Sequence, residues 1–141
     1  MTKPFEIEAN IAKHKEKLNK LLSGDAYLFS SERKQITEDA GVYIIYDKTE
    51  GKVLYVGESD NLRRRLFTDH KSGNRRGSAF RRAISKWKDI DNETVIRQCI
   101  VQNFSFRVLP ISDKLERKRL EHFAIAVLAP TLNDVVKLGI V

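Results

Sequence analysis

The segment GVYII (41–45) is followed, after the polar segment 47–52, by VLYVG (53–57). Apolar runs rich in β-branched and aromatic residues, joined by a polar loop that contains glycine, are typical of a β-hairpin. Gly51 predicts a turn over Thr49-Glu50-Gly51, because glycine readily takes the left-handed conformation that closes such a loop. The residues that meet across this hairpin therefore follow from the turn.

The turn predicts a strand register that brings two tyrosines together. Three pairs face each other: Asp47 with Val53, Ile45 with Tyr55, and Tyr43 with Gly57. Tyr43 and Tyr55 are then diagonal neighbours on one face of the hairpin, roughly 7–8 Å apart at the backbone. Such a gap could hold a water and a phosphate oxygen. A shift of one residue would put the two side chains on opposite faces.

Length and composition favour one globular domain, since the chain has 141 residues of which 41% are hydrophobic. The first residues contain no apolar signal-peptide core, and no segment approaches the ~18 consecutive apolar residues of a membrane span. Cys99 is the single cysteine, so no intramolecular disulfide can form. We therefore expect a cytoplasmic, reducing location and no membrane association.

The positive charge is concentrated in one part of the chain. Residues 61–88 contain ten Lys or Arg and one acidic residue, Asp69, whereas the net charge of the whole chain is +7. The remainder of the chain is therefore slightly acidic. A local excess of this size favours a polyanionic partner such as nucleic acid.

The residues before the hairpin predict a helical extension, assigned to 1–40, ahead of a main domain at 41–141. Within it, 5–22 has apolar residues at helical spacing, including Ile7, Ile11 and Leu18, and Gly24 is a plausible end. We expect this extension to pack on the domain or cover it rather than to carry catalytic groups.

A short helix is predicted after the hairpin. Asp60-Asn61 caps it, and it runs from Leu62 to about Asp69. Leu62 and Leu66 form its apolar stripe, and Arg64 points away from them. Arg63 and Arg65 flank the stripe, and either could reach a site beside the hairpin.

Two helices, a strand and a long helix follow. Ser78 caps a helix at 79–87 that should expose Arg81, and Asn92 caps the next helix. Residues 104–109 alternate as a third strand. Asp113 begins the long helix, whose segment 123–129 is apolar all round and is expected to be buried. Glu121 enters that segment, where a carboxylate needs a partner or a metal.

Taken together, these residues resemble the GIY-YIG nuclease family. The resemblance rests on Gly41-Val42-Tyr43, Tyr55-Val56-Gly57, Arg65 ten residues after Tyr55, Glu121, and Pro130 leading to Asn133, and it covers about 41–133. It implies an α+β fold with a small three-stranded antiparallel sheet flanked by helices, here with an extra N-terminal helix. It also implies a metal-dependent DNA endonuclease, as in repair nucleases, homing endonucleases and some restriction enzymes.

The resemblance implies a role for each tyrosine. Tyr43 would be the general base that activates a water, and Tyr55 would orient that water or contact phosphate; the reverse assignment is open. A phenol has an unperturbed pKa of ~10, so it accepts a proton near neutral pH only beside a cation or metal. Without the family, both tyrosines would be ordinary strand residues.

The remaining site residues also follow from the resemblance. Arg65 would clamp the scissile phosphate with a permanently charged guanidinium. Glu121 would hold one Mg²⁺ or Mn²⁺ through oxygen; as an alternative, it forms a structural ion pair with Arg117 or a neighbour. Asn133 would position the loop after the helix, and the two motif glycines, Gly41 and Gly57, would support the site.

This chain departs from the family pattern in two places. Many members carry a histidine four residues after the key arginine, but here that place is Asp69 and His70 comes one residue later. On a continuous α-helix His70 would point toward Arg63, away from Arg65, which leaves it at most a supporting role. Glu58 stands where lysine or glutamine is often seen, and it would assist the metal or point outward.

The basic stretch supplies the expected DNA contacts, which are Arg63, Arg64, Lys71, Arg75, Arg76, Arg81 and Arg82. Two alternatives to an endonuclease remain. One is a basic nucleic-acid-binding module that keeps the fold with little or no turnover. The other is a nuclease-like domain that acts through protein partners bound by residues 1–40.

Overall fold

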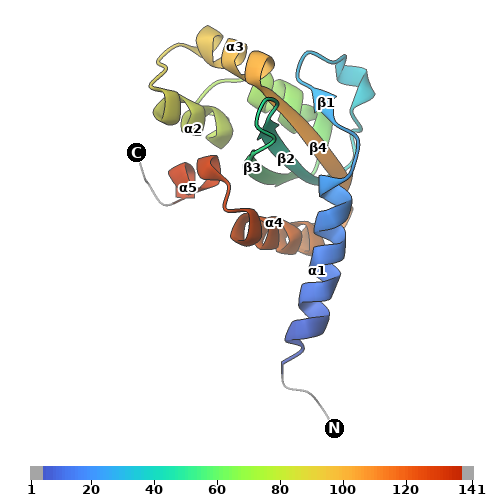
Figure 1. The fold of residues 1–141 in the computed structure, drawn as a ribbon. Coiled ribbons are helices and arrows are strands. Elements are labelled where there is room, and N and C mark those ends of the chain that lie inside the picture. Colours follow the sequence, from blue (N-terminus) through green and yellow to red (C-terminus); the bar gives the residue numbers. More distant parts are fainter. Residues whose placement is uncertain (1–4, 138–141) are drawn as a thin grey trace.

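The computed structural model describes residues 5–137, whose centre is an antiparallel sheet (Figure 1). Its strands are β1 (Tyr27–Leu28), β2 (Gly41–Asp47), β3 (Val53–Ser59) and β4 (Phe104–Pro110), in the spatial order β1-β4-β2-β3. The three predicted strands form the body of this sheet. The two-residue β1, which pairs with β4, is a fourth strand that the sequence did not predict.

The hairpin has the register on which the predicted tyrosine pair depends. Tyr43 pairs with Gly57 and Ile45 pairs with Tyr55. Gly51 has φ 71°, so it takes the left-handed conformation that the turn requires. The predicted pairing of Asp47 with Val53 is wrong: the register shifts by a bulge after Ile45, and Val53 pairs with Tyr46.

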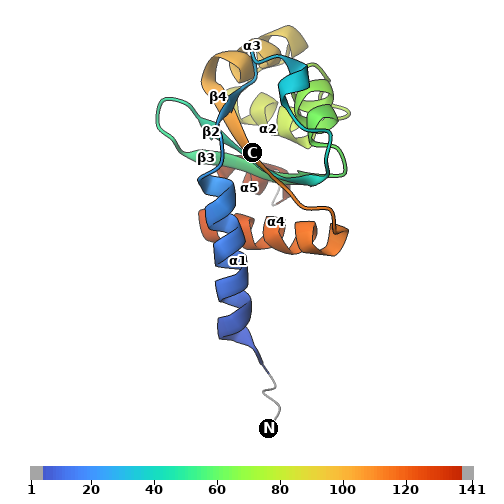
Figure 2. The same ribbon diagram turned by 90° about the vertical axis from the view of Figure 1, so that its right-hand side faces the viewer.

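Helices cover both faces of the sheet (Figures 1 and 2). On one face, α1 (Ile7–Leu22) and α4 (Lys114–Leu128) pack on Val42, Ile44 and Val56. The other face is covered by η2 (Arg64–Lys71), α2 (Ala79–Lys88) and α3 (Glu93–Asn103). The short α5 (Thr131–Lys137) contacts both α2 and β3. A single 3₁₀ turn, η1 (Arg33–Gln35), lies in the connector before β2.

Helix α1 confirms the predicted N-terminal helix, but only its second half packs on the domain. Leu18 and Leu21 are buried, whereas Phe5 is 77% exposed and Ile7 and Ile11 are also exposed. Both ribbon views show the first half extending away from the body of the molecule (Figures 1 and 2).

The prediction that 123–129 is buried on all sides is wrong. Helix α4 lies on the surface of the sheet and buries one face through Leu120 and Ala124. On the opposite face Val127 is 57% exposed. An apolar run without polar interruption carries no signal of which face meets the sheet, so the sequence could not separate these two faces.

The helix after the hairpin begins as predicted and then changes type. The Asn61 side-chain oxygen accepts the Arg64 backbone N–H as an N-cap. From Arg64 to Lys71, however, the chain forms a π-helix, which is wider than an α-helix. This widening changes which side chains face the hairpin.

Candidate active site

Tyr43 and Tyr55 lie on one face of the sheet, as the register predicts. Their ring centroids are 6.4 Å apart. Tyr43 is buried, and its hydroxyl passes over Gly57, where an added Cβ would lie 2.3 Å from the Tyr43 oxygen. Gly57 is therefore required by the position of Tyr43. Gly41 is equally enclosed, because a Cβ there would lie 2.5 Å from the Leu109 carbonyl oxygen.

Of the two arginines that flank the helical stripe, Arg65 reaches the tyrosines. Its guanidinium pairs with Asp69 at 3.1 Å and, as a nearby positive charge, acts to lower the pKa of Tyr43 and of Tyr55. Arg63 turns away to the connector, where it pairs with Glu38 and donates to the Ile36 carbonyl. The structure thus separates two residues that the helix phase left equivalent.

His70 joins the site, so the predicted orientation toward Arg63 is wrong. Its Nε2 lies 2.6 Å from the Tyr43 hydroxyl oxygen, and its Nδ1 lies 2.8 Å from the Ser78 Oγ. The cause is the π-helix: its turn contains more than four residues, so a residue five positions after Arg65 returns close to the same side. The wider turn of the π-helix therefore accommodates a spacing of five residues, instead of four, between Arg65 and His70.

Burial dominates the ionisation of this group. Burial is the main reason that the pKa of Tyr43 lies well above 10 and that the pKa of Tyr55 is raised to about 12. The Glu121 carboxylate acts in the same direction on both phenols, as Tyr55 does on Tyr43, and Arg65 opposes these effects. For His70, burial and then the positive charges of Arg65 and Arg81 lower the pKa to about 3. At neutral pH, His70 is therefore a neutral imidazole that bonds two hydroxyl groups.

Glu121 approaches the tyrosines from α4. Its side chain is only 14% exposed, and its charge acts on the pKa of both phenols. Of the ion-pair partners considered above, Arg117 bonds Glu58, whereas the Nε2 of the neighbouring His122 lies 3.8 Å from a Glu121 carboxylate oxygen. Within residues 5–137 no group of three or more His, Cys, Asp or Glu could hold a metal. A single carboxylate fits Mg²⁺, which keeps several waters and often binds one or two carboxylates together with a phosphate.

Asn133 holds the strand that carries Tyr55. Its side-chain oxygen accepts the Val56 N–H at 2.8 Å, and its amide donates to the Val56 carbonyl at 2.9 Å. The prediction that Asn133 lies in a loop is wrong, because α4 ends at Leu128 and α5 begins at Thr131, after only Ala129 and Pro130. The side chain thereby fixes the backbone between Tyr55 and Gly57.

Glu58 lies on the opposite face of the sheet from the tyrosines, next to α4. Burial opposes its ionisation, but hydrogen bonds from Arg117 and Lys118 lower its pKa below the usual range. This pairing satisfies a carboxylate that the family pattern does not predict. No local pattern indicated that Arg117, which lies in a charged run, would be buried with it.

The prediction that α2 exposes Arg81 is wrong. Arg81 is 1% exposed. Its guanidinium donates to the carbonyls of His70, Lys71 and Glu93 and pairs with the Glu93 carboxylate at 3.2 Å. Arg81 therefore ties the end of η2 to the start of α3.

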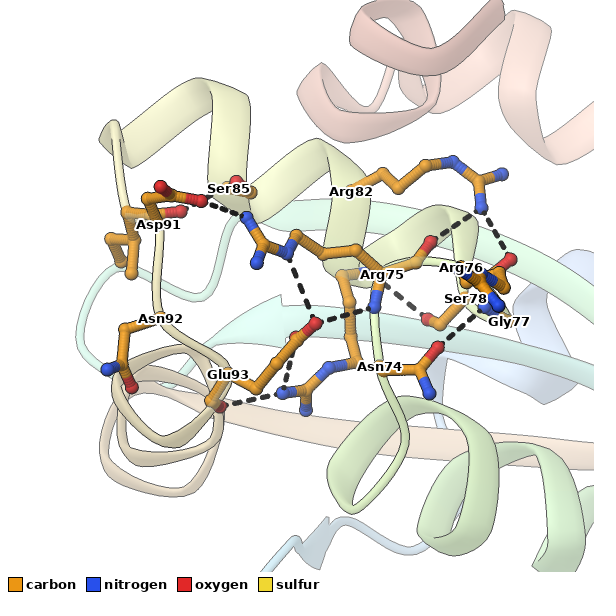
Figure 3. Close-up of polar contacts among 12 residues, drawn as sticks. Asn74, Arg75, Arg76, Gly77, Ser78, Arg82, Ser85, Asp91, Asn92 and Glu93 are labelled. Carbon is orange, nitrogen blue, oxygen red and sulfur yellow. Dashed lines mark hydrogen bonds and ion pairs between the residues drawn. The ribbon is translucent and has the colours of Figure 1, made fainter.

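Other cations of the basic stretch are also bound within the protein. Figure 3 shows Arg75 between Asp91 and Glu93, at 2.6 Å and 3.1 Å. Arg64 pairs with Asp60 one turn earlier. Arg82 donates to the carbonyls of Arg75 and Arg76 (Figure 3), and its charge acts to lower the pKa of Tyr55. Arg82 is therefore the cation of α2 that acts on the tyrosine pair.

The family model of the GIY-YIG catalytic domain matches residues 39–123, which is more than half of the chain. The chain belongs to the GIY-YIG family. The matched range contains both tyrosines, Arg65, His70 and Glu121, and it ends before Asn133. No curated protein sequence matches the chain.

Solved structures of the GIY-YIG N-terminal endonuclease domain of UvrC from Thermotoga maritima are similar to this chain. The magnesium-bound form is 19% identical, covers 84% of this chain and 97% of the UvrC domain, and has a TM-score of 0.41. A point-mutant form of the same domain, bound to its catalytic divalent cation, is 17% identical, covers 84% of this chain and 94% of the UvrC domain, and also has a TM-score of 0.41.

Within residues 5–137 of the present GIY-YIG chain, no helix is long and apolar enough to cross a membrane.

Proposed function

We propose that this protein is a metal-dependent endonuclease that hydrolyses phosphodiester bonds in DNA. The observation that carries the proposal is the group formed by Tyr43 and Tyr55, 6.4 Å apart on one sheet face, with Arg65 and Glu121 acting on both. A module that only binds nucleic acid has no need for two buried phenols beside a carboxylate. The family assignment supports the same class of chemistry.

In this proposal Tyr43 is the general base. Its hydroxyl is oriented by the neutral His70, and Arg65 favours the charged phenolate. Tyr55, which is less buried, positions the water or the phosphate; exchange of the two roles stays open. Arg65 neutralises charge on the phosphate through its guanidinium.

Glu121 would hold one Mg²⁺ or Mn²⁺, with waters and the substrate phosphate as further ligands. A divalent cation there supplies charge stabilisation at the phosphate and lowers the pKa of groups that bind it. Asn133 keeps the Tyr55 strand in place through both polar groups of Val56.

The substrate backbone would run from the tyrosines over the solvent-exposed cations of α2 and the loop before it. Arg76, Arg82 and Lys86 are exposed, in contrast to Arg81. Phosphate contacts of this kind give affinity without sequence specificity.

We assign the catalytic unit to 41–141, with 1–40 as an extension. We also assign the protein to the reducing cytoplasm, where the half-buried Cys99 stays a thiol.

A DNA-binding module without turnover is the second candidate, because the raised pKa values keep both phenols protonated in the absence of a metal. A cleavage assay on plasmid, branched and single-stranded DNA, with EDTA, Mg²⁺ or Mn²⁺, separates the two. An endonuclease cuts at least one form with metal and none with EDTA. Salt-dependent duplex binding without cleavage under any condition identifies the module.

A further inference from the structure

Two adjoining grooves lie beside η2 and share Lys71. The larger, of about 550 Å³, is bounded mainly by α3, and the smaller, of about 290 Å³, by the connector at 31–33. In Figure 1 the green η2 segment lies between α3 and this connector. His70, which bonds Tyr43, and Lys71, which lines both grooves, are consecutive residues of η2.

The lining of the grooves is basic and polar. It contains three cations, Arg33, Lys71 and Arg97, and no carboxylate. Within residues 5–137, none of these cations takes part in an ion pair, whereas Arg63, Arg75 and Arg81 elsewhere in the same region are all paired. The grooves thus hold uncompensated positive charge, in addition to that of the exposed Arg76, Arg82 and Lys86.

Two of the three cations, Lys71 and Arg97, are close enough to repel each other. Burial, followed by the positive charge of Arg97, lowers the pKa of Lys71. Arg33 donates to the Thr68 hydroxyl at 2.7 Å, and the Lys71 ammonium lies 5.2 Å from the centre of the Phe67 ring. Neutral contacts therefore orient Arg33 and Lys71, while no carboxylate compensates their positive charges. Binding of an anion would be favourable there, because it would compensate these charges.

We propose that these grooves bind the phosphate backbone of nucleic acid outside the segment held at Tyr43. The proposal rests on the proposed function. Cations distributed over two adjoining grooves suit successive phosphates of a polyanion better than one free phosphate. The lining also offers hydroxyl and amide donors for phosphate oxygens, from Ser72, Thr94 and Gln98 among others.

The test is the double variant R33A/R97A, studied by fluorescence anisotropy with a labelled duplex of about 30 base pairs at several salt concentrations. Each phosphate contact contributes about 0.9 to the slope of log affinity against log salt. The slope should therefore fall by about 1–2, and affinity at low salt should fall about tenfold or more. The matched control is K15A/K52A, which removes two exposed lysines outside the grooves and should change both quantities much less.

Thermal melting of each variant checks that it is folded, and R33Q/R97Q replaces the alanine pair if that pair melts early. Equal salt slopes for wild type and R33A/R97A, in a protein that still binds and cuts DNA, would contradict binding in the grooves and leave the proposed function intact. Equal changes of slope and affinity in R33A/R97A and K15A/K52A would also contradict it, because net charge alone would then explain DNA binding. A wild type that neither binds nor cuts DNA overturns both.

Discussion

The position of one hydroxyl group organises the candidate site. The Tyr43 hydroxyl lies against Gly57, bonds His70 at 2.6 Å and is influenced by Arg65. These neighbours come from the opposite strand and from the helix after it, so the site exists only in the folded protein. Substitutions next to this hydroxyl should therefore affect catalysis more than their size suggests.

Gly57→Ala tests the close approach of Tyr43. The new methyl group would lie 2.3 Å from the phenol oxygen, so the ring or the strand must move. We expect a loss of about 1–3 kcal/mol of folding stability and a much larger fractional loss of cleavage. Gly24→Ala is the control, since its nearest non-neighbouring atom would be 3.5 Å away and it should leave cleavage unchanged. Full cleavage by folded Gly57→Ala would contradict the described position of Tyr43.

The pH dependence of stability tests the environment of His70. Because its pKa in the folded protein is about 3, against 6.5 for the free side chain, the unfolded chain binds one more proton between these values. This contribution to stability is complete above pH 6.5 and declines as pH falls toward 3, by up to about 1.4 kcal/mol per pH unit.

His70→Gln lacks this contribution, so urea unfolding at pH 7, 5 and 4 should show wild type losing its advantage over the variant as the pH falls. Parallel losses in both proteins would mean that His70 is not held neutral. The same pair of proteins, compared for cleavage at pH 7, reports whether orientation of the Tyr43 hydroxyl matters.

The sequence predicted the tyrosine pair but not the role of His70. The pairing of Tyr43 with Gly57 follows from local turn chemistry around Gly51, which the sequence displays. The orientation of His70 depends on a π-helix, which has no local sequence signature and is held by contacts from another helix.

At the level of elements, Arg81 joins three of them. It lies on α2, bonds the last carbonyls of η2 and pairs with Glu93 at the start of α3. By holding the end of η2, it also keeps His70 beside Ser78 and Tyr43. Arg81 is therefore a positioning residue for the site.

Arg81→Met should lower the free energy of unfolding by about 3 kcal/mol, since it leaves buried carbonyls and Glu93 without their donor. The exposed neighbour Arg82→Met should cost little stability but weaken DNA binding. Chemical denaturation measures the first effect and anisotropy the second. If Arg82→Met destabilises the protein as much as Arg81→Met, the assignment of these two residues is wrong.

Helix starts were predictable because their signals are local. Ser78, Asn92 and Asp113 each accept a backbone N–H as N-cap, as the sequence predicts. Burial of Arg81, by contrast, requires carbonyl groups from two other elements. The sequence pattern around Arg81 is that of an exposed helical face, so no local feature distinguishes it from Arg82.

In the molecule as a whole, the extension before β2 has a solvent-exposed first part and a later part that contributes residues to the hydrophobic core. The first half of α1 extends into solvent, while Phe29 and Ile36 belong to the main hydrophobic core. Deletion of residues 1–12 should therefore leave the melting temperature nearly unchanged. Deletion of residues 1–40 also removes Phe29 and Ile36 and should prevent stable folding, because loss of one such side chain already costs about 2–5 kcal/mol.

Circular dichroism melts of the two truncated proteins measure this difference. A stable, cooperative 41–141 fragment would show instead that the extension is dispensable and would support a separate domain there.

The concentration of positive charge at 61–88 was evident from the sequence. The ion pairs that Arg75 forms were not, since its partners Asp91 and Glu93 lie outside that stretch.

The central claim is that Glu121 supports metal-dependent cleavage, and Glu121→Gln tests it most directly. The change keeps size and polarity but removes the charge that holds a divalent cation. The control is Glu116→Gln, which removes a carboxylate of the same helix, α4, that pairs with Lys17 of α1. Wild type and both variants are compared for cleavage with Mg²⁺ or Mn²⁺ and for duplex binding. We predict that Glu121→Gln binds DNA nearly as well as wild type and cuts none, while Glu116→Gln cuts normally. Folded Glu121→Gln protein that cuts at the wild-type rate would contradict the claim.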